Sequence, residues 1–220
     1  LLQAYDGAPS ADTLKARLSE QAATLRGWDF RWGVASVPTT LAVYWGTHLL
    51  ARVAPAALAR HLSPQTYIAQ GATPGELLGA LAAASDSLTA AFGTWKTPWG
   101  EINRFQRLND DIAPRFEDAG ASIPVPFTSG IWGSLASFGA RPWPGTRKWY
   151  GTSGNSFVAV VEFGDSVRAM AVTAGGESGQ PGSPHFNDQA ERYASGTLRD
   201  VYFYRAQLQG HTEREYHPGE

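Results

Sequence analysis

Sequence typical of β-strands is confined to the last third of this 220-residue chain. Residues Ser156 to Phe163 are rich in β-branched and aromatic side chains, Gly164-Asp165 follows as a turn, and Ser166 to Thr173 repeats the pattern. This arrangement predicts a β-hairpin, and Asp200 to Tyr204 predicts one further strand. A hairpin with a single extra strand cannot bury both of its faces alone. We therefore expect these strands to complete a sheet whose other parts lie elsewhere.

The first 94 residues have the spacing of amphipathic helices. Apolar residues recur every three or four positions from Ala11 to Leu25, which predicts one helix. A second is predicted from Thr39 to Val53, because prolines flank it on both sides. A third is predicted from Thr73 to Phe92, with proline in its first turn and glycine just beyond its end. We expect residues 1–94 to form a helical segment.

Residues 95–150 have a different character, since prolines and glycines recur there between single aromatic residues. Regular elements should be short in such sequence, and long irregular stretches are uncommon inside self-contained domains. We therefore expect aromatic loops lying on a larger body, followed in residues 151–220 by the strands and a polar C-terminal tail. The fold class predicted is α+β, and the chain is expected to be one incomplete domain that is not autonomous.

Composition excludes several classes of partner and site. A net charge of −2 and a pI near 6.2 give no reason to expect nucleic acid or an anionic membrane as partner. The most apolar window, Thr39 to Leu50, is too short to span a bilayer, so no membrane insertion is expected. The chain has no cysteine, and its five histidines lack the spacing of metal ligands. We expect no metal and no cofactor.

Three other kinds of site find little support in the sequence. The glycines of Gly175 to Gly179 are not followed by the Gly-Lys-Ser/Thr of a phosphate-binding loop. Ser178 does not lie in a Gly-x-Ser-x-Gly elbow, and Ser183-Pro184-His185 brings a hydroxyl near an imidazole only along the chain. The eight tryptophans and eight tyrosines leave one alternative open, a non-catalytic aromatic-rich module that binds carbohydrate or peptide.

Two segments of the last third carry a family resemblance. Gly154-Asn155-Ser156-Phe157-Val158-Ala159-Val160-Val161-Glu162-Phe163 and Gly179-Gln180-Pro181-Gly182-Ser183-Pro184-His185-Phe186-Asn187-Asp188-Gln189 resemble the end of the β-chain of penicillin-acylase-family enzymes. The similarity is greatest to acyl-homoserine-lactone acylases and aculeacin-type acylases. Leu25 to Asp29 and Trp99 to Phe105 are similar to earlier segments of the same β-chain, so the resemblance spans most of the sequence in order.

The resemblance implies an N-terminal-nucleophile hydrolase with αββα layers. Such a precursor is inactive until autoproteolysis gives α and β chains, and the new β-chain terminus, usually serine, is both nucleophile and base. Its α-amine suits this role because the pKa lies near neutrality. Leu1 has no nucleophilic atom and looks like a cut edge, so the nucleophile and the oxyanion donors are expected outside this chain.

The resemblance implies an acylase in which this chain is active only together with the rest of the precursor. The chain would be the C-terminal portion of the β-chain, with the α-chain and the front of the β-chain as partners. The substrate would be an acyl amide of a small amine, such as an N-acyl-homoserine lactone (a quorum-quenching activity) or a β-lactam or lipopeptide amide. The resemblance also implies a periplasmic or secreted bacterial protein.

One residue is a candidate for a role near the nucleophile. Some relatives carry an acidic residue at the place of Asn155, where it orients a histidine close to the terminal serine. The resemblance implies that Asn155 accepts a hydrogen bond from such an imidazole, without the negative charge that would raise the basicity of the ring. The alternative is that its side chain only caps the start of a strand. Gly154 and Ser156 would be neighbours in the same site.

Overall fold

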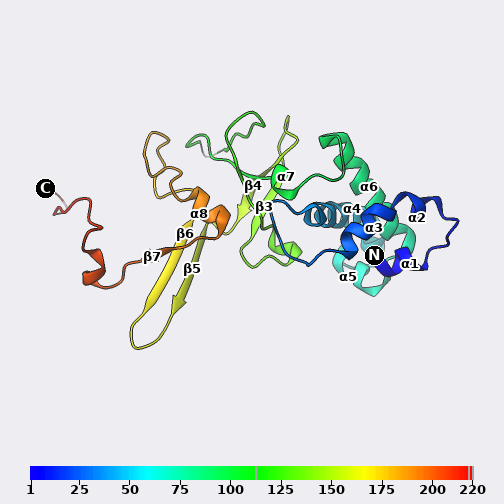
Figure 1. Cartoon of the computed structure of the whole chain (residues 1–220), viewed down its shortest axis with the longest axis horizontal. Helices are drawn as coiled ribbons and strands as arrows, with labels where there is room; N and C mark the ends of the chain where they lie inside the picture. Colours follow the sequence, from blue (N-terminus) through cyan, green and yellow to red (C-terminus); the bar gives the residue numbers. More distant parts are fainter. Residues whose placement is uncertain (112, 218, 220) are drawn as a thin grey trace.

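The chain forms a helical body at one end and a long β-hairpin toward the other, with a second group of strands between them (Figure 1). The computed structural model describes residues 1–111, 113–217 and 219. The α+β prediction, with helices first and strands later, is confirmed. The helices are α1 (Leu2–Gly7), α2 (Thr13–Arg17), α3 (Ser19–Arg26), α4 (Val37–Ala59), α5 (Pro64–Gly71), α6 (Pro74–Phe92), α7 (Trp99–Ile102), α8 (Ala190–Ser195) and the short 3-10 helices η1 (Gly130–Trp132) and η2 (Arg205–Leu208).

The strands form two separate sheets. Sheet A has the order β2-β1-β4-β3, and sheet B has the order β5-β6-β7. Sheet A is antiparallel except where β1 runs parallel to β4, and sheet B is antiparallel throughout. The strands are β1 (Asn103–Phe105), β2 (Ile123–Pro124), β3 (Phe138–Pro142), β4 (Trp149–Gly154), β5 (Phe157–Glu162), β6 (Arg168–Thr173) and β7 (Arg199–Val201).

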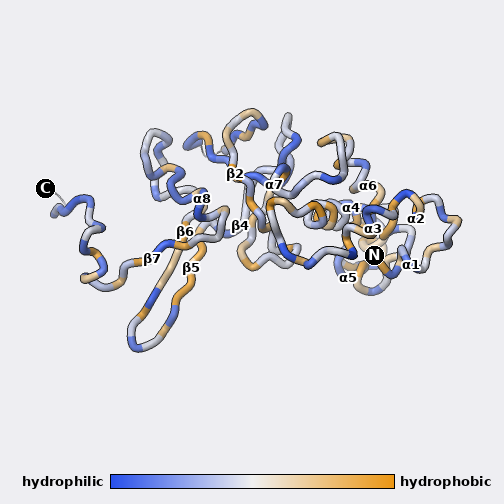
Figure 2. The backbone as a smooth tube through the Cα atoms, in the orientation of Figure 1, coloured by the Kyte–Doolittle hydropathy of each residue, from blue (hydrophilic) through white to orange (hydrophobic). Residues whose placement is uncertain are grey.

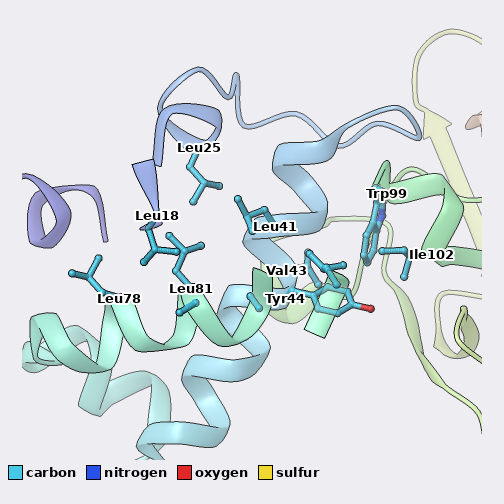
Figure 3. Packing of buried hydrophobic residues seen from close by; sticks show 12 residues of the cluster. Leu18, Leu25, Leu41, Val43, Tyr44, Leu78, Leu81, Trp99 and Ile102 are labelled. Atoms are coloured by element: carbon cyan, nitrogen blue, oxygen red, sulfur yellow. The ribbon is translucent and has the colours of Figure 1, made fainter. Parts of the chain in front are cut away.

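The helical body is organised around α4 and α6, which pack along each other. Their ends follow from local chemistry: Thr73 and Glu76 form a reciprocal capping box at the start of α6, and Gly93 ends it with a φ of 80°. Leu18, Leu41 and Leu81 are fully buried between α4, α6 and the short N-terminal helices (Figure 3). Burying each such leucine contributes about 1.5–3 kcal/mol.

Two helix predictions differ from the structure. The helix predicted from Ala11 to Leu25 is instead the pair α2 and α3, which meet at Leu18; this residue has a non-helical ψ of 11° and is completely buried. The second predicted helix extends past Pro55 to Ala59. A proline inside a helix costs about 3 kcal/mol. Val53 and Ala57 are fully buried on either side of it, and this burial offsets the cost.

Residues 95–150 are more ordered than the sequence predicted, because β1, β2, β3 and the first residues of β4 lie within them. Several aromatic residues of this segment pack against the rest of the chain. Trp99 and Tyr150 are buried, and the ring of Trp149 stacks on Tyr44 of α4. Sheet A therefore lies between the helical body and sheet B, held to the helices by aromatic contacts (Figure 1).

The predicted hairpin is confirmed as β5 and β6, paired from Phe157↔Thr173 to Glu162↔Arg168. Its strand β5 is mostly apolar in sequence (Figure 2), and exposed apolar side chains lie on both faces of the hairpin. Val160 (60% exposed) and its partner Met170 (43%) lie on one face, and Val161 (45%) lies on the other. None of the described helices is both long and apolar enough to cross a membrane.

Candidate functional site

The candidate residues lie where the two sheets meet, since β4 ends at Gly154 and β5 begins at Phe157. Gly154 has a φ of 124°, a conformation that side chains rarely allow. A Cβ at this position would lie far inside the contact distance of the Ser137 carbonyl oxygen. The junction therefore requires glycine, for its conformation and for its close approach to the neighbouring backbone.

Asn155 extends the pairing of β3 and β4 by one residue beyond the strands. Its backbone N–H donates to the carbonyl oxygen of Ser137 at 2.8 Å, and its side-chain Oδ1 accepts from the Ser137 N–H at 2.7 Å. The side chain thus binds a backbone amide, as the capping alternative predicts. The role of Asn155 toward a nucleophile stays a prediction.

Tyr193 of α8 makes a further hydrogen bond to Asn155. Its hydroxyl donates to the backbone carbonyl oxygen of Asn155 at 2.8 Å. The side chain is only 3% exposed and packs among three phenylalanine rings, and this burial raises the pKa of Tyr193 to about 12. The hydroxyl therefore keeps its proton and remains a donor at neutral pH. Sequence reasoning missed Tyr193.

Asn155 lies at the rim of an open hollow of about 310 Å³ between the sheets. Phe105, Ser156 and Tyr193 also line it. An adjoining hollow of about 390 Å³ continues along Thr152 and Ser156 to the glycine-rich loop. All three residues of the predicted site thus line one concave surface, which opens to solvent and combines aromatic rings with backbone and hydroxyl groups.

The family model for penicillin amidase matches residues 2–210 of the chain. The chain belongs to the penicillin amidase family. The match takes in the helical body, both sheets and the Gly154–Ser156 junction, so the family resemblance found in the sequence is confirmed. Penicillin amidases are acylases of the N-terminal-nucleophile class, and the reaction of this family is amide hydrolysis.

Among the described residues of this penicillin amidase chain, two histidines lie near a serine hydroxyl, in space or along the chain, and neither belongs to a complete triad. His48 Nε2 lies 3.0 Å from the Ser87 hydroxyl, between α4 and α6, and makes no further hydrogen bond to a described carboxylate. His185 Nδ1 contacts Asp188 at 2.9 Å, which raises the pKa of the ring, while the Ser183 hydroxyl accepts from the backbone N–H of His185 and not from its ring. Neither has the serine–imidazole–carboxylate order of a triad.

The glycine-rich loop after β6 serves as a structural element in this chain. The Arg107 guanidinium donates through Nη1 to the Phe186 carbonyl oxygen at 2.6 Å and through Nη2 to that of Ser178 at 3.0 Å. It also lies 3.9 Å from the centre of the Phe186 ring. Gln189 Oε1 accepts from the backbone N–H of Thr173, which closes the loop against β6. Within the described part of the chain, no three His, Asp or Glu side chains gather as a metal site requires.

Proposed function

We propose that this chain is the C-terminal part of the β-chain of an acylase that hydrolyses the amide between an acyl chain and a small amine. The observation that carries the proposal is the penicillin amidase match over residues 2–210. Acyl-homoserine lactones are the favoured substrates and lipopeptide amides a further candidate, because residues 154–163 and 179–189 resemble acyl-homoserine-lactone and aculeacin-type acylases. A β-lactam amide is a third candidate. The enzyme would act in the periplasm or outside the cell.

Sheet B supports the proposal that other segments of the same precursor are the partners. The Ala174 N–H donates to the Ser156 carbonyl oxygen at 2.8 Å, which makes these residues a hydrogen-bonded pair. Because such pairs alternate along antiparallel strands, Phe157, Ala159 and Val161 direct their N–H and C=O groups to the open edge of β5. An open edge between two apolar faces is the surface that added strands and covering layers would bury.

The reactive hydroxyl in this proposal belongs to the N-terminal residue of the β-chain, in a segment outside the 220 residues. Its α-amine takes the hydroxyl proton through a bridging water, because an α-amine with a pKa near 8 is unprotonated to about one tenth at neutral pH, whereas a lysine amine is almost fully protonated. Backbone and amide donors then stabilise the oxyanion. This chain contributes the sheet layer beneath the site and the Asn155 side chain at its rim.

The test is made with the complete precursor, expressed with residues 1–220 intact. Purified protein is assayed for release of the free amine from N-acyl-homoserine lactones of several chain lengths, from penicillins and from an acylated cyclic peptide. Mass spectrometry identifies the new chain terminus. We expect processing to an N-terminal Ser, Thr or Cys and hydrolysis of at least one substrate class. A fully processed protein that releases no amine from any of them contradicts the proposal.

The alternative of an aromatic-rich binding module makes a different prediction, namely that residues 1–220 unfold cooperatively alone and bind sugar or peptide through exposed tryptophans. Trp99 is 1% exposed and Trp149 stacks on Tyr44, which favours an anchoring role for the central aromatic residues. A thermal unfolding curve of the isolated chain separates the two. A broad or absent transition supports the hydrolase, and a sharp one with sugar binding supports the module.

A further inference from the structure

The orientation of the Asn155 amide is fixed by the chemistry of its partner. The atom 2.7 Å from its side chain is the backbone N–H of Ser137, a group that can only donate a hydrogen bond. The atom of the Asn155 amide that faces it must therefore be the oxygen, and the NH2 group must point the other way. The usual ambiguity between the two ends of an asparagine amide does not arise here.

The backbone around this side chain is held at several points. The Asn155 N–H is bonded to Ser137, its carbonyl oxygen accepts from Tyr193, and Gly154 leaves no room for a shift toward β3. Tyr193 is itself immobilised among aromatic rings and is almost fully buried. The Asn155 side chain thus has one hydrogen-bonded rotamer, although the residue as a whole is exposed.

The remaining end of the side chain offers only donors. Nδ2 makes no hydrogen bond to any described residue, and Asn155 lines the hollow between the sheets. An amide NH2 carries two N–H donors and has no acceptor capacity. Because Oδ1 is already held by the Ser137 N–H, Nδ2 is the end of the side chain without a partner among the described residues, and it can only donate, whereas a carboxylate at the same position would present a second acceptor.

We propose that Asn155 acts in the assembled enzyme as a fixed hydrogen-bond donor, through Nδ2, to an acceptor atom of the segment that completes the site, and that Ser137 and Tyr193 are its positioning residues. The acceptor is an unprotonated ring nitrogen or a carbonyl oxygen. This inference rests on the proposed function, and it reverses the direction expected from the sequence, in which Asn155 was to accept from an imidazole N–H. A ring held in this way keeps its proton on the nitrogen farther from Asn155.

The decisive variant is Asn155→Asp in the complete processed enzyme, because it keeps the oxygen that accepts from Ser137 and replaces only the NH2 group. We expect kcat to fall about tenfold or more, the effect of losing one hydrogen bond worth about 1.4 kcal/mol in the transition state, with KM within about twofold and thermal stability unchanged. The new charge should also move the acidic limb of the pH–rate profile to higher pH, because it favours the protonated form of a nearby base.

Controls separate this role from a structural one. Asn155→Ala, which also loses the bond to Ser137, should lower both kcat and thermal stability, and Gln209→Glu in the exposed tail should reproduce only the added charge. Tyr193→Phe should lower kcat several-fold at unchanged KM. Tyr67→Phe, which removes an equally buried hydroxyl that donates to Glu76 at 3.1 Å, should leave kcat unchanged.

An Asn155→Asp enzyme with wild-type or higher kcat and an unmoved pH profile overturns the inference while leaving the proposed function intact. If the wild-type enzyme hydrolyses no amide, the proposed function fails, and the donor role is decided by an experimental structure of the assembled protein. An acceptor atom within about 3.2 Å of Nδ2 supports it there. A donor, or water alone, in that place overturns it.

Discussion

Gly154→Ala places a methyl group against the Ser137 carbonyl oxygen, in a backbone conformation with a φ of 124°. Holding a residue with a side chain in such a region costs about 1–3 kcal/mol. The clash also moves Asn155 away from Ser137 and breaks the two hydrogen bonds between them, each worth about 0.5–1.5 kcal/mol. The expected local destabilisation is therefore about 4 kcal/mol.

Alanine substitutions at two other glycines separate the conformational cost from the cost of the clash. Gly145 has a φ of 83° but no neighbour within 4 Å, so Gly145→Ala should show only the conformational part, about 1–2 kcal/mol. Gly179 has neither a positive φ nor a close neighbour, and Gly179→Ala should be neutral or slightly stabilising. All three changes add the same methyl group to a glycine outside the helices.

Hydrogen exchange read by mass spectrometry measures the effect where it arises, at the Asn155 amide of the assembled enzyme. A local loss of about 4 kcal/mol accelerates exchange about a thousandfold, because each 1.4 kcal/mol is a factor of ten. Gly145→Ala and Gly179→Ala should leave this amide protected. An Asn155 amide that exchanges equally slowly in the Gly154→Ala enzyme would refute the argument that the junction requires glycine.

Three further substitutions test other parts of the structure. Arg107→Ala removes two charge-assisted hydrogen bonds to the glycine-rich loop, and amide exchange in residues 176–186 should rise about tenfold to a hundredfold; unchanged exchange would mean the loop is held by other contacts. Hydrogen bonds, first of all from Thr173, hold the pKa of Glu177 below its usual 4.5, so its stabilising contribution is present at neutral pH and is lost as the pH falls through the lowered value. Glu177→Gln should therefore flatten the decline of the unfolding midpoint at acid pH, and a decline as steep as wild type would count against this. Gly46→Ala gains about 1 kcal/mol in helix propensity but meets the Trp132 ring at 2.5 Å, where overpacking costs about 1–3 kcal/mol, so the unfolding midpoint should fall and not rise.

Sequence reasoning succeeded where the structure depends on neighbours along the chain. The start of α6 follows from Thr73 and Glu76, three residues apart, and its end from Gly93. The hairpin follows from two β-rich segments around a Gly-Asp turn. The predicted helix end before Pro55 was wrong, because burial against α5 stabilises the helix beyond it. Local helix propensity takes no account of such a tertiary contact.

Sheet A was missed for a similar reason. Its strands have two to six residues, and β1 pairs in parallel with β4 across more than forty intervening residues. Its strands are interrupted by prolines and glycines, so the alternation that marks a strand never develops.

The site was only half predictable. Asn155 was selected through the resemblance, but Ser137 lies 18 residues before it and Tyr193 lies 38 residues after it. The spacing of these residues along the chain does not predict that they are in contact. Their contacts fix the position of Asn155 and the orientation of its amide, and neither could be read from the sequence.

In the proposed enzyme, other segments of the precursor finish sheet B. Hydrogen exchange of residues 157–161 in the isolated chain and in the assembled enzyme tests it directly, because Phe157, Ala159 and Val161 direct their amides to the open edge of β5. We predict rapid exchange of these three amides in the isolated chain and strong protection in the enzyme. Equally rapid exchange in both would show that the edge stays open and would contradict the claim.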